Sequence, residues 1–209
     1  MGRRFASKGE QVVLGDLTLD GAERVAADIQ AQGGTAVATH RDGRDEVSAA
    51  AAVALAQGTF GGLDGHHCNL ARFVGGDFER GILKLPLDQF DNTTRTNLRG
   101  YYLCSRAALP ALLGRGKGSI IYTSSPAAAD GCPTQVAYAT AKAGVEAIMR
   151  HVAARYGASD IHANCIAPGS TLHPRPRPSS MMPPRRSASV WRPSSRVWPA
   201  RRPPSWSRC

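Results

Sequence analysis

Short apolar segments alternate with longer amphipathic ones along most of this chain. Because the intervening segments are alanine-rich or repeat apolar residues at helical spacing, helices are expected between the apolar ones. Such alternation predicts an α/β fold, a doubly wound sandwich around a parallel sheet. The apolar segments are typical of buried parallel strands, and they are Gln11–Asp16, Thr35–His40, Leu63–Leu70, Ser119–Thr123 and Ile161–Ala167.

The expected helices have recognisable ends. Residues 2–9 resemble the last turns of a helix. The next helix begins at Asp20, which we interpret as its N-cap, and ends before Gly33 and Gly34. Further helices are predicted over Asp45–Gln57, over a long segment from Leu87 to Leu113, and over the alanine-rich segment that runs to Arg150.

The last of these helices carries the strongest candidate for chemistry. Residues four apart share a helix face, so Lys142 can lie beside Tyr138. A cation next to a phenol favours the phenolate and lowers the phenol's pKa from about 10 toward neutrality. A tyrosine tuned in this way can exchange a proton with a carbinol or carbonyl oxygen, to which Ser125 could also donate. Tyr-x-x-x-Lys is common on ordinary helices, so the pair alone leaves a purely structural role open.

The basic charge of the chain is concentrated at one end. The net charge of +10 comes mainly from residues 173–209, which hold nine arginines and no acidic residue. The first 172 residues carry 17 basic and 16 acidic side chains and are close to neutral. We therefore predict two parts, a folded domain over residues 1–172 and a tail over residues 173–209.

The composition of the tail predicts disorder, because the tail holds nine of the fourteen prolines and all three tryptophans and shows no periodicity. An abrupt change of composition after Leu172 is also what an out-of-frame reading of GC-rich DNA produces, which is one hypothesis for its origin. The alternative is a functional tail, in which arginines and tryptophans bind nucleic acid through phosphate contacts and base stacking. Solvated charge is the more common role of such segments, so a nucleic-acid partner is not expected.

With the motifs taken together, residues 3–172 resemble the short-chain dehydrogenase/reductase family. The resemblance rests on Asn97, on Ser125 thirteen residues before Tyr138, on Lys142, and on the Pro168–Gly169 turn after a strand-like segment. It implies that Tyr138 is the general acid/base and that Lys142 lowers its pKa and holds the nicotinamide ribose. It further implies that Ser125 orients the substrate oxygen and that Asn97 secures the proton-relay water.

The same resemblance implies a cofactor site. Asp16 ends its strand where an acid accepts hydrogen bonds from the adenosine ribose and repels a 2′-phosphate, so NAD is favoured over NADP. Asp42 corresponds to an acid near the adenine, and Tyr138, Lys142, Pro168 and Gly169 to residues around the nicotinamide. A solvated acid in a turn is the alternative interpretation of Asp16.

The segment His67–Ala71 stands where the family has Asn-Asn-Ala-Gly. Asn69 matches and Ala71 takes the place of the glycine, whereas Cys68 and Leu70 depart from the motif, which puts the close approach of adenosine in doubt. His66, His67 and Cys68 also raise the question of a metal. No metal site is predicted, because adjacent residues on a strand point to opposite faces and no second ligand cluster has the right spacing.

Two parts of the family pattern are missing from this sequence. No glycine-rich turn precedes Gln11, and the expected fold is an incomplete doubly wound, Rossmann-like sheet without its usual first and last strands. A parallel sheet that lacks a central strand leaves unpaired backbone groups on both sides of the gap. The alternative function is therefore a catalytically inactive fragment of such an enzyme, which binds NAD poorly.

Cysteine and hydropathy patterns bear on location and partners. The five cysteines are unclustered, which indicates reduced thiols in a cytoplasmic protein. No apolar run approaches the ~20 residues of a membrane span, so no membrane partner is expected. The resemblance implies a small-molecule alcohol or ketone substrate and a homodimer or homotetramer, and the sequence does not identify the substrate.

Overall fold

The computed structural model describes residues 1–72, 81–130 and 132–169. Within them the strands are β1 (Gln11–Asp16), β2 (Thr35–His40), β3 (Gly65–Cys68), β4 (Gly118–Thr123) and β5 (Ile161–Ile166). The helices are α1 (Gly2–Ala6), α2 (Leu19–Ala31), α3 (Glu46–Phe60), α4 (Leu87–Thr94), α5 (Gly100–Arg115) and α6 (Val136–Tyr156). A π-helical turn, η2 (Arg95–Arg99), joins α4 to α5, and the short 3-10 turns η3 (Pro126–Ala128) and η4 (Gly157–Ser159) flank α6.

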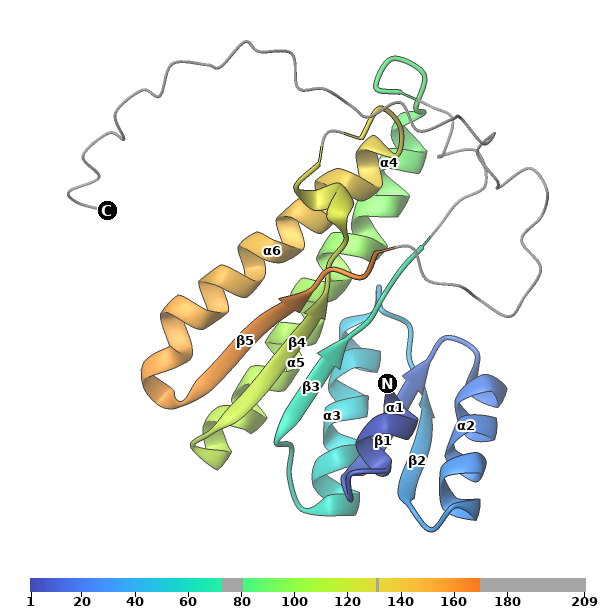
Figure 1. Cartoon of the computed structure of the whole chain (residues 1–209), viewed down its shortest axis with the longest axis vertical. Helices are drawn as coiled ribbons and strands as arrows, with labels where there is room; N and C mark the ends of the chain where they lie inside the picture. The colour runs from blue at the N-terminus through green and yellow to red at the C-terminus, as the bar shows by residue number, and fades with distance from the viewer. Residues whose placement is uncertain (73–80, 131, 170–209) are drawn as a thin grey trace. The chain divides into compact units, whose positions relative to one another are not determined.

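The strands are parallel and belong to two separate sheets within the described residues. One sheet pairs β1 with β2, and the other has the order β3-β4-β5. The α/β class and the parallel pairing predicted from the sequence are confirmed. The division lies between β1 and β3, where the sequence led us to expect a missing strand (Figure 1).

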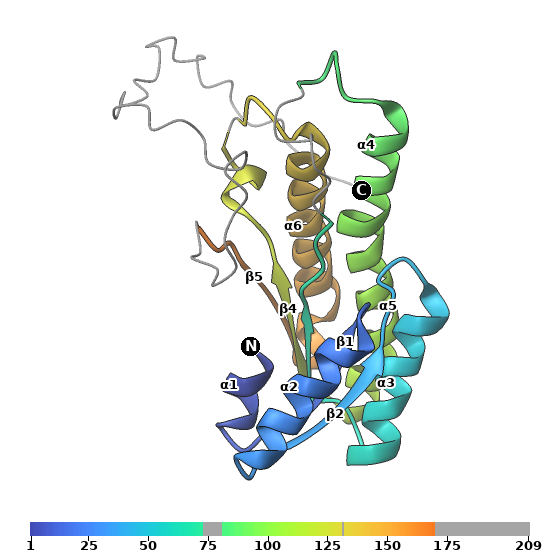
Figure 2. The same cartoon turned by 90° about the vertical axis from the view of Figure 1, so that its right-hand side faces the viewer.

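Helices pack on both sheets. Helices α5 and α6 cover the β3-β4-β5 sheet, α3 contacts both α5 and β1, and α1 and α2 lie against β1 (Figures 1 and 2). The main core lies between the three-stranded sheet and helices α5 and α6. Its central side chains include Tyr101, Leu112, Ile120, Tyr122 and Val145. A smaller core under α2 is built from Ala6, Ala26, Ile29 and Ala36.

Most element bounds agree with the sequence predictions to within a few residues, and α2 and β3 are among those that differ in detail. Thr18, not Asp20, is the N-cap residue of α2, and Asp20 lies in the first turn. Asp16 explains the shift, because its Oδ1 accepts a hydrogen bond from the backbone N–H of Thr18 at 2.8 Å and so ends the strand in a tight turn. The third strand is shorter than predicted, since only Gly65–Cys68 pairs with β4.

The long helix predicted over Leu87–Leu113 is interrupted by the π-helical turn η2 and continues to Arg115. Single π turns inside α-helices widen the backbone locally and are frequent at functional sites. Asn97 lies in this turn and is fully buried.

Among the described residues, no helix is long and apolar enough to cross a bilayer. The tail predicted over residues 173–209, with its expected disorder and its alternative nucleic-acid role, lies outside the described residues, so both remain predictions.

Candidate active site

The carboxyl ends of the parallel strands bring most of the predicted site residues to one edge of each sheet. In the three-stranded sheet, Cys68 pairs with Tyr122 and Thr123 pairs with Ile166. The segments that follow β3, β4 and β5 therefore leave the sheet at the same edge. Ligands of open parallel sheets bind in the crevice beyond this edge.

Lys142 projects from α6 to this edge and is almost completely buried. Its ammonium nitrogen donates to the backbone carbonyls of Thr123 at 2.7 Å and Leu70 at 3.3 Å, and to the phenol oxygen of Tyr101 at 2.8 Å. Burial lowers the pKa of Lys142 to about 8, because desolvation disfavours the ammonium. The amine is thus held inside the protein, at the ends of β3 and β4.

Tyr138 lies one helical turn before Lys142, on the same side of α6. The ammonium nitrogen lies 5.6 Å from the centroid of the Tyr138 ring and 4.5 Å from that of Tyr101. Both distances are within the range of cation–π attraction. The i, i+4 spacing therefore places the cation against the predicted acid/base, as the sequence led us to expect.

Tyr101 is a site residue that sequence reasoning missed. Its ring is fully buried, and its hydroxyl accepts from the backbone N–H of Leu70 at 3.1 Å. The same oxygen is within hydrogen-bond distance of the carbonyls of Leu70 and Thr123, at 2.8 and 2.9 Å. Burial raises the pKa of Tyr101 well above its usual value, so this phenol stays protonated. Together, Tyr101 and Lys142 connect α5 and α6 to the ends of β3 and β4.

Asn97 secures the chain just beyond β3. Its Oδ1 accepts from the backbone N–H of Arg72 at 2.6 Å, and its Nδ2 donates to the carbonyl of Arg72 at 3.0 Å. This paired arrangement uses both ends of the side-chain amide, and it resembles one rung of a β-ladder. The structure therefore gives Asn97 a positioning role toward the β3 loop.

Ser124 and Ser125 end the β4 segment in different environments. Ser125 is half-buried and caps η3, where its Oγ accepts from the backbone N–H of Ala127 at 3.3 Å. The turn η3 packs against α6, the helix of Tyr138. Ser124 is buried, and its hydroxyl donates to Oε1 of Glu146 at 2.8 Å. Of the two serines, Ser125 is the more accessible to a substrate oxygen.

The two acids predicted to contact the adenosine lie at neighbouring strand ends. Asp16 is exposed at the end of β1, and its backbone carbonyl accepts from the N–H of Arg41 just after β2. Asp42 binds Arg44 through both carboxylate oxygens, at 2.7 to 3.2 Å. Hydrogen bonds from the Arg44 side chain and backbone lower the pKa of Asp42 to about 2. Asp42 is thus already paired, whereas Asp16 presents its carboxylate to solvent.

The remaining predicted cofactor residues lie on exposed segments after strands. Asn69 and Ala71 follow β3, and Pro168 and Gly169 follow β5; all four are exposed. Leu70 instead turns inward, and its methyl groups lie against Gly43 and Gly100 so closely that a Cβ at either glycine would clash. Leu70 is larger than the small residue that the family motif has at this position. It therefore fills space beside the loop after β2 that a small residue would leave open.

Comparison with known proteins is consistent with this arrangement. A family model described as Enoyl-(Acyl carrier protein) reductase matches residues 1–187. A solved structure from Burkholderia xenovorans assigned to the short-chain dehydrogenases/reductases superposes with a TM-score of 0.74 and 27% identity, covering 81% of this chain and 66% of that one. The chain belongs to the short-chain dehydrogenase/reductase family.

Relatives within the short-chain dehydrogenase/reductase family include named dehydrogenases. A 2-(R)-hydroxypropyl-CoM dehydrogenase from Xanthobacter autotrophicus is 33% identical over 168 residues, which are 79% of this chain and 66% of the relative. A 2,5-dichloro-2,5-cyclohexadiene-1,4-diol dehydrogenase from Sphingobium indicum is 33% identical over 171 residues, 81% of this chain and 66% of the relative. An uncharacterized oxidoreductase from Bacillus subtilis is also 33% identical, and the match covers 81% of this chain and 61% of that relative. The chain thus spans less than two thirds of the length of these relatives.

Proposed function

We propose that this protein is an oxidoreductase that moves a hydride between a nicotinamide cofactor and the carbinol or carbonyl carbon of a small alcohol or ketone. The observation that carries this proposal is the buried Lys142 ammonium, 5.6 Å from the Tyr138 ring centroid at the carboxyl edge of the sheet. An amine with its pKa lowered to about 8 is still largely charged at pH 7. A charged amine at this distance attracts negative charge that develops on the phenol oxygen while a proton is exchanged there.

The residues of this chain fit a dinucleotide at two places. Asp16 offers an exposed carboxylate at the end of β1, which suits the two hydroxyls of an adenosine ribose and disfavours a 2′-phosphate. Asn69, Ala71, Pro168 and Gly169 lie on the exposed segments beyond β3 and β5. We therefore propose NAD as the preferred cofactor, with the adenosine toward Asp16 and the nicotinamide toward the ends of β4 and β5.

Each proposed catalytic role follows from a position in the fold. The nicotinamide, when bound, supplies or accepts the hydride. Tyr138 transfers the proton to the substrate oxygen in reduction or removes it in oxidation, and Ser125 donates a hydrogen bond to that oxygen. Asn97 fixes the loop after β3 through the backbone of Arg72 and keeps the strand ends in place for Lys142.

Replacement of Tyr138 by Phe tests the assignment. General acid–base groups contribute about 10²–10⁴-fold to rate, so NAD-dependent oxidation of a panel of small secondary alcohols should fall by about that factor. Tyr102→Phe is the matched control, since Tyr102 is half-exposed on α5 and outside the proposed site. Equal loss in both variants, or unchanged turnover in Tyr138→Phe, would remove Tyr138 from the mechanism.

One structural feature favours the alternative, a catalytically inactive fragment that binds the nucleotide weakly. Within the described residues, β1 and β3 belong to different sheets, so the strand ends that carry Asp16 and Asn69 are not joined by backbone hydrogen bonds. Titration of NADH fluorescence against the full chain separates the two functions. Saturable binding that weakens on Asp16→Ala supports the enzyme, and an absence of binding at millimolar NADH supports the alternative.

We also propose an assembly and a location. Tyr102, Leu109 and Leu113 on α5 and Ile148 and Tyr156 on α6 border a common surface depression, and Tyr102 and Leu113 are substantially exposed. Pairing of two copies through these helices would cover this apolar surface, giving a homodimer or homotetramer. The cysteines of the described residues are free thiols, which supports a cytoplasmic location.

A further inference from the structure

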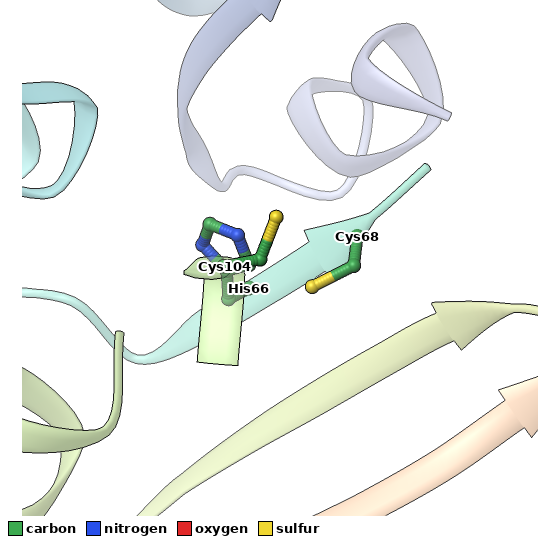
Figure 3. A group of neighbouring side chains, drawn as sticks. All are labelled: His66, Cys68 and Cys104. Carbon is green, nitrogen blue, oxygen red and sulfur yellow. The ribbon is translucent and has the colours of Figure 1, made fainter. Parts of the chain in front are cut away.

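Three potential metal ligands from β3 and α5 come together in the core. His66 and Cys68 on β3 and Cys104 on α5 place a ring nitrogen and two sulfur atoms within 4.8 Å of one another. Figure 3 shows the Cys68 side chain directed toward the other two, with the imidazole beside Cys104. None of the residues proposed for hydride transfer belongs to this group.

Strand geometry explains why this group was missed in the sequence. Residues two apart on a strand point to the same face, so His66 and Cys68 share a face while His67 points away. His67 is engaged on its own side, where its Nε2 lies 3.0 Å from Oγ1 of Thr123. The third ligand, Cys104, is far away in the sequence and reaches the group only because α5 packs on β3.

The surroundings favour a soft cation. Both thiols are fully buried, and Nε2 of His66 is buried without a hydrogen-bond partner among the described residues. The guanidinium of Arg41, also buried, donates to Sγ of Cys104. The cluster thus holds two buried thiols and a buried ring nitrogen that has no hydrogen-bond partner among the described residues.

We propose that His66, Cys68 and Cys104 bind one zinc ion. Cysteine thiolate and imidazole nitrogen are the ligands that zinc prefers, at about 2.3 Å and 2.0–2.1 Å respectively. In tetrahedral geometry these bond lengths set the ligand atoms roughly 3.5–4 Å apart, so small side-chain rotations bring the three atoms into position. The fourth position is left for a water molecule.

Binding releases the two thiol protons to solvent, and the two thiolates then neutralise the divalent ion. The Arg41 guanidinium keeps its positive charge and remains a hydrogen-bond donor to the ligating sulfur of Cys104. Hydrogen-bond donors to metal-ligating side chains orient those side chains and adjust the properties of the bound metal. Bound zinc would connect β3, which pairs only with β4 among the described residues, to helix α5. The ion would therefore stabilise β3, the outer strand that lies next to the division between the two sheets.

Zinc binding is measured on the full-length chain in which Cys132, Cys165 and Cys209 are all replaced by Ala, so that only the two proposed thiols remain. The protein is reduced, freed of metal with a chelator, and titrated with zinc against a chromophoric competitor. We expect one zinc per chain and a melting temperature that rises with zinc concentration, because an ion that binds only the folded state stabilises it. Cobalt in place of zinc should give the sulfur-to-metal charge-transfer absorption and the intense visible bands of a tetrahedral site.

Matched variants in this background assign the ligands. Cys68→Ser, Cys104→Ser and His66→Asn should each weaken zinc binding by about 100-fold or more, since even the loss of an outer-shell partner typically costs 10–100-fold. His67→Asn, one residue along the same strand, should leave the affinity within about threefold. Equal weakening by His66→Asn and His67→Asn, or tight binding that survives both serine variants, would overturn the proposal.

A direct measurement does not depend on the three ligand variants. X-ray absorption at the zinc edge of the metal-loaded background protein should show two sulfur ligands and two nitrogen or oxygen ligands. A site with no sulfur or with one sulfur, or a stoichiometry below one zinc per chain at saturating metal, would also overturn the proposal.

Discussion

The ammonium nitrogen of Lys142 lies 2.8 Å from the phenol oxygen of Tyr101, a residue on a different helix from Tyr138. The same amine binds carbonyls at the ends of β3 and β4 and faces the Tyr138 ring at 5.6 Å. One buried cation thus joins two helices and two strand ends and also lies against the ring of the proposed acid/base. Its structural and chemical roles are therefore coupled, and they can be separated by substitutions at its partners.

Removal of the Tyr101 hydroxyl should destabilise the fold. In Tyr101→Phe, Lys142 loses one acceptor and the Leu70 backbone loses its partner inside the core. Buried polar groups left without a partner cost about 1–3 kcal/mol each, so the free energy of unfolding should fall by about that amount. Urea denaturation followed by circular dichroism measures the change. Tyr102→Phe on the adjacent, half-exposed position is the control and should change the free energy by less than about 0.5 kcal/mol.

Lys142 should make the stability of the protein depend on alkaline pH. Burial lowers its pKa to about 8 in the folded state, against 10.5 for a lysine side chain exposed to water. Between these values the unfolded chain binds more protons than the folded one, so stability attributable to Lys142 rises with pH. The burial penalty is fully present below pH 8 and is relieved as pH rises toward 10.5. The total difference is about 3 kcal/mol, at 1.36 kcal/mol per unit of pKa.

A comparison with Lys142→Met isolates this contribution from other titrating groups. The free energy of unfolding of each protein is measured from pH 7 to pH 10.5, and the difference between them is plotted. The free energy of unfolding of the unsubstituted protein should rise steadily relative to that of the variant as the pH increases above 8. A difference that does not change with pH would mean that the amine keeps an ordinary pKa in the folded protein. A difference that falls as the pH rises would mean that the folded protein stabilises the charged form of the amine.

Asn97 should control local opening of the loop after β3. Its side chain holds both the N–H and the carbonyl of Arg72, so Asn97→Ala leaves that N–H without its acceptor. Loss of a bond worth about 1.4 kcal/mol corresponds to tenfold faster opening, so amide hydrogen exchange at Arg72 should accelerate by roughly 10-fold. Asn92→Ala, at an exposed position of α4, should leave the exchange rate unchanged. Protection at Arg72 that persists in Asn97→Ala would contradict this role.

Local patterns were sufficient for the elements of the fold. The segments Gln11–Asp16 and Thr35–His40 were predicted with the bounds that the structure has, because each apolar run ends abruptly at polar residues. A gap with unpaired backbone groups was expected from the sequence, but the division of the strands into two separate sheets was not predicted. The π-helical turn at Asn97 was not predicted from the sequence.

Contacts between distant segments could not be predicted in this way. Helical spacing placed Lys142 beside Tyr138, but its hydrogen bonds to Tyr101 and to strand-end carbonyls depend on how α5, α6 and β4 pack. Cys104 is similar, since nothing near it in the sequence relates it to Cys68. Asp42 was assigned to the adenine by the resemblance, and its ion pair with Arg44 two residues later was not predicted.

The charge of Asp16 should decide between the two nicotinamide dinucleotides. Its carboxylate is exposed at the end of β1, and one oxygen accepts from the N–H of Thr18 at 2.8 Å. Asp16→Asn keeps an oxygen for that hydrogen bond and removes the charge. Two unit charges about 4 Å apart interact by between 1 and 4 kcal/mol near a protein surface, so relief of repulsion should raise the affinity for NADPH relative to NADH by about 10-fold or more.

Fluorescence titrations with both nucleotides measure the ratio, and Asp20→Asn, which changes an exposed acid in the first turn of α2, serves as the control. If Asp20→Asn shifts the ratio as much as Asp16→Asn, the preference reflects the overall charge of this surface and not a contact made by Asp16.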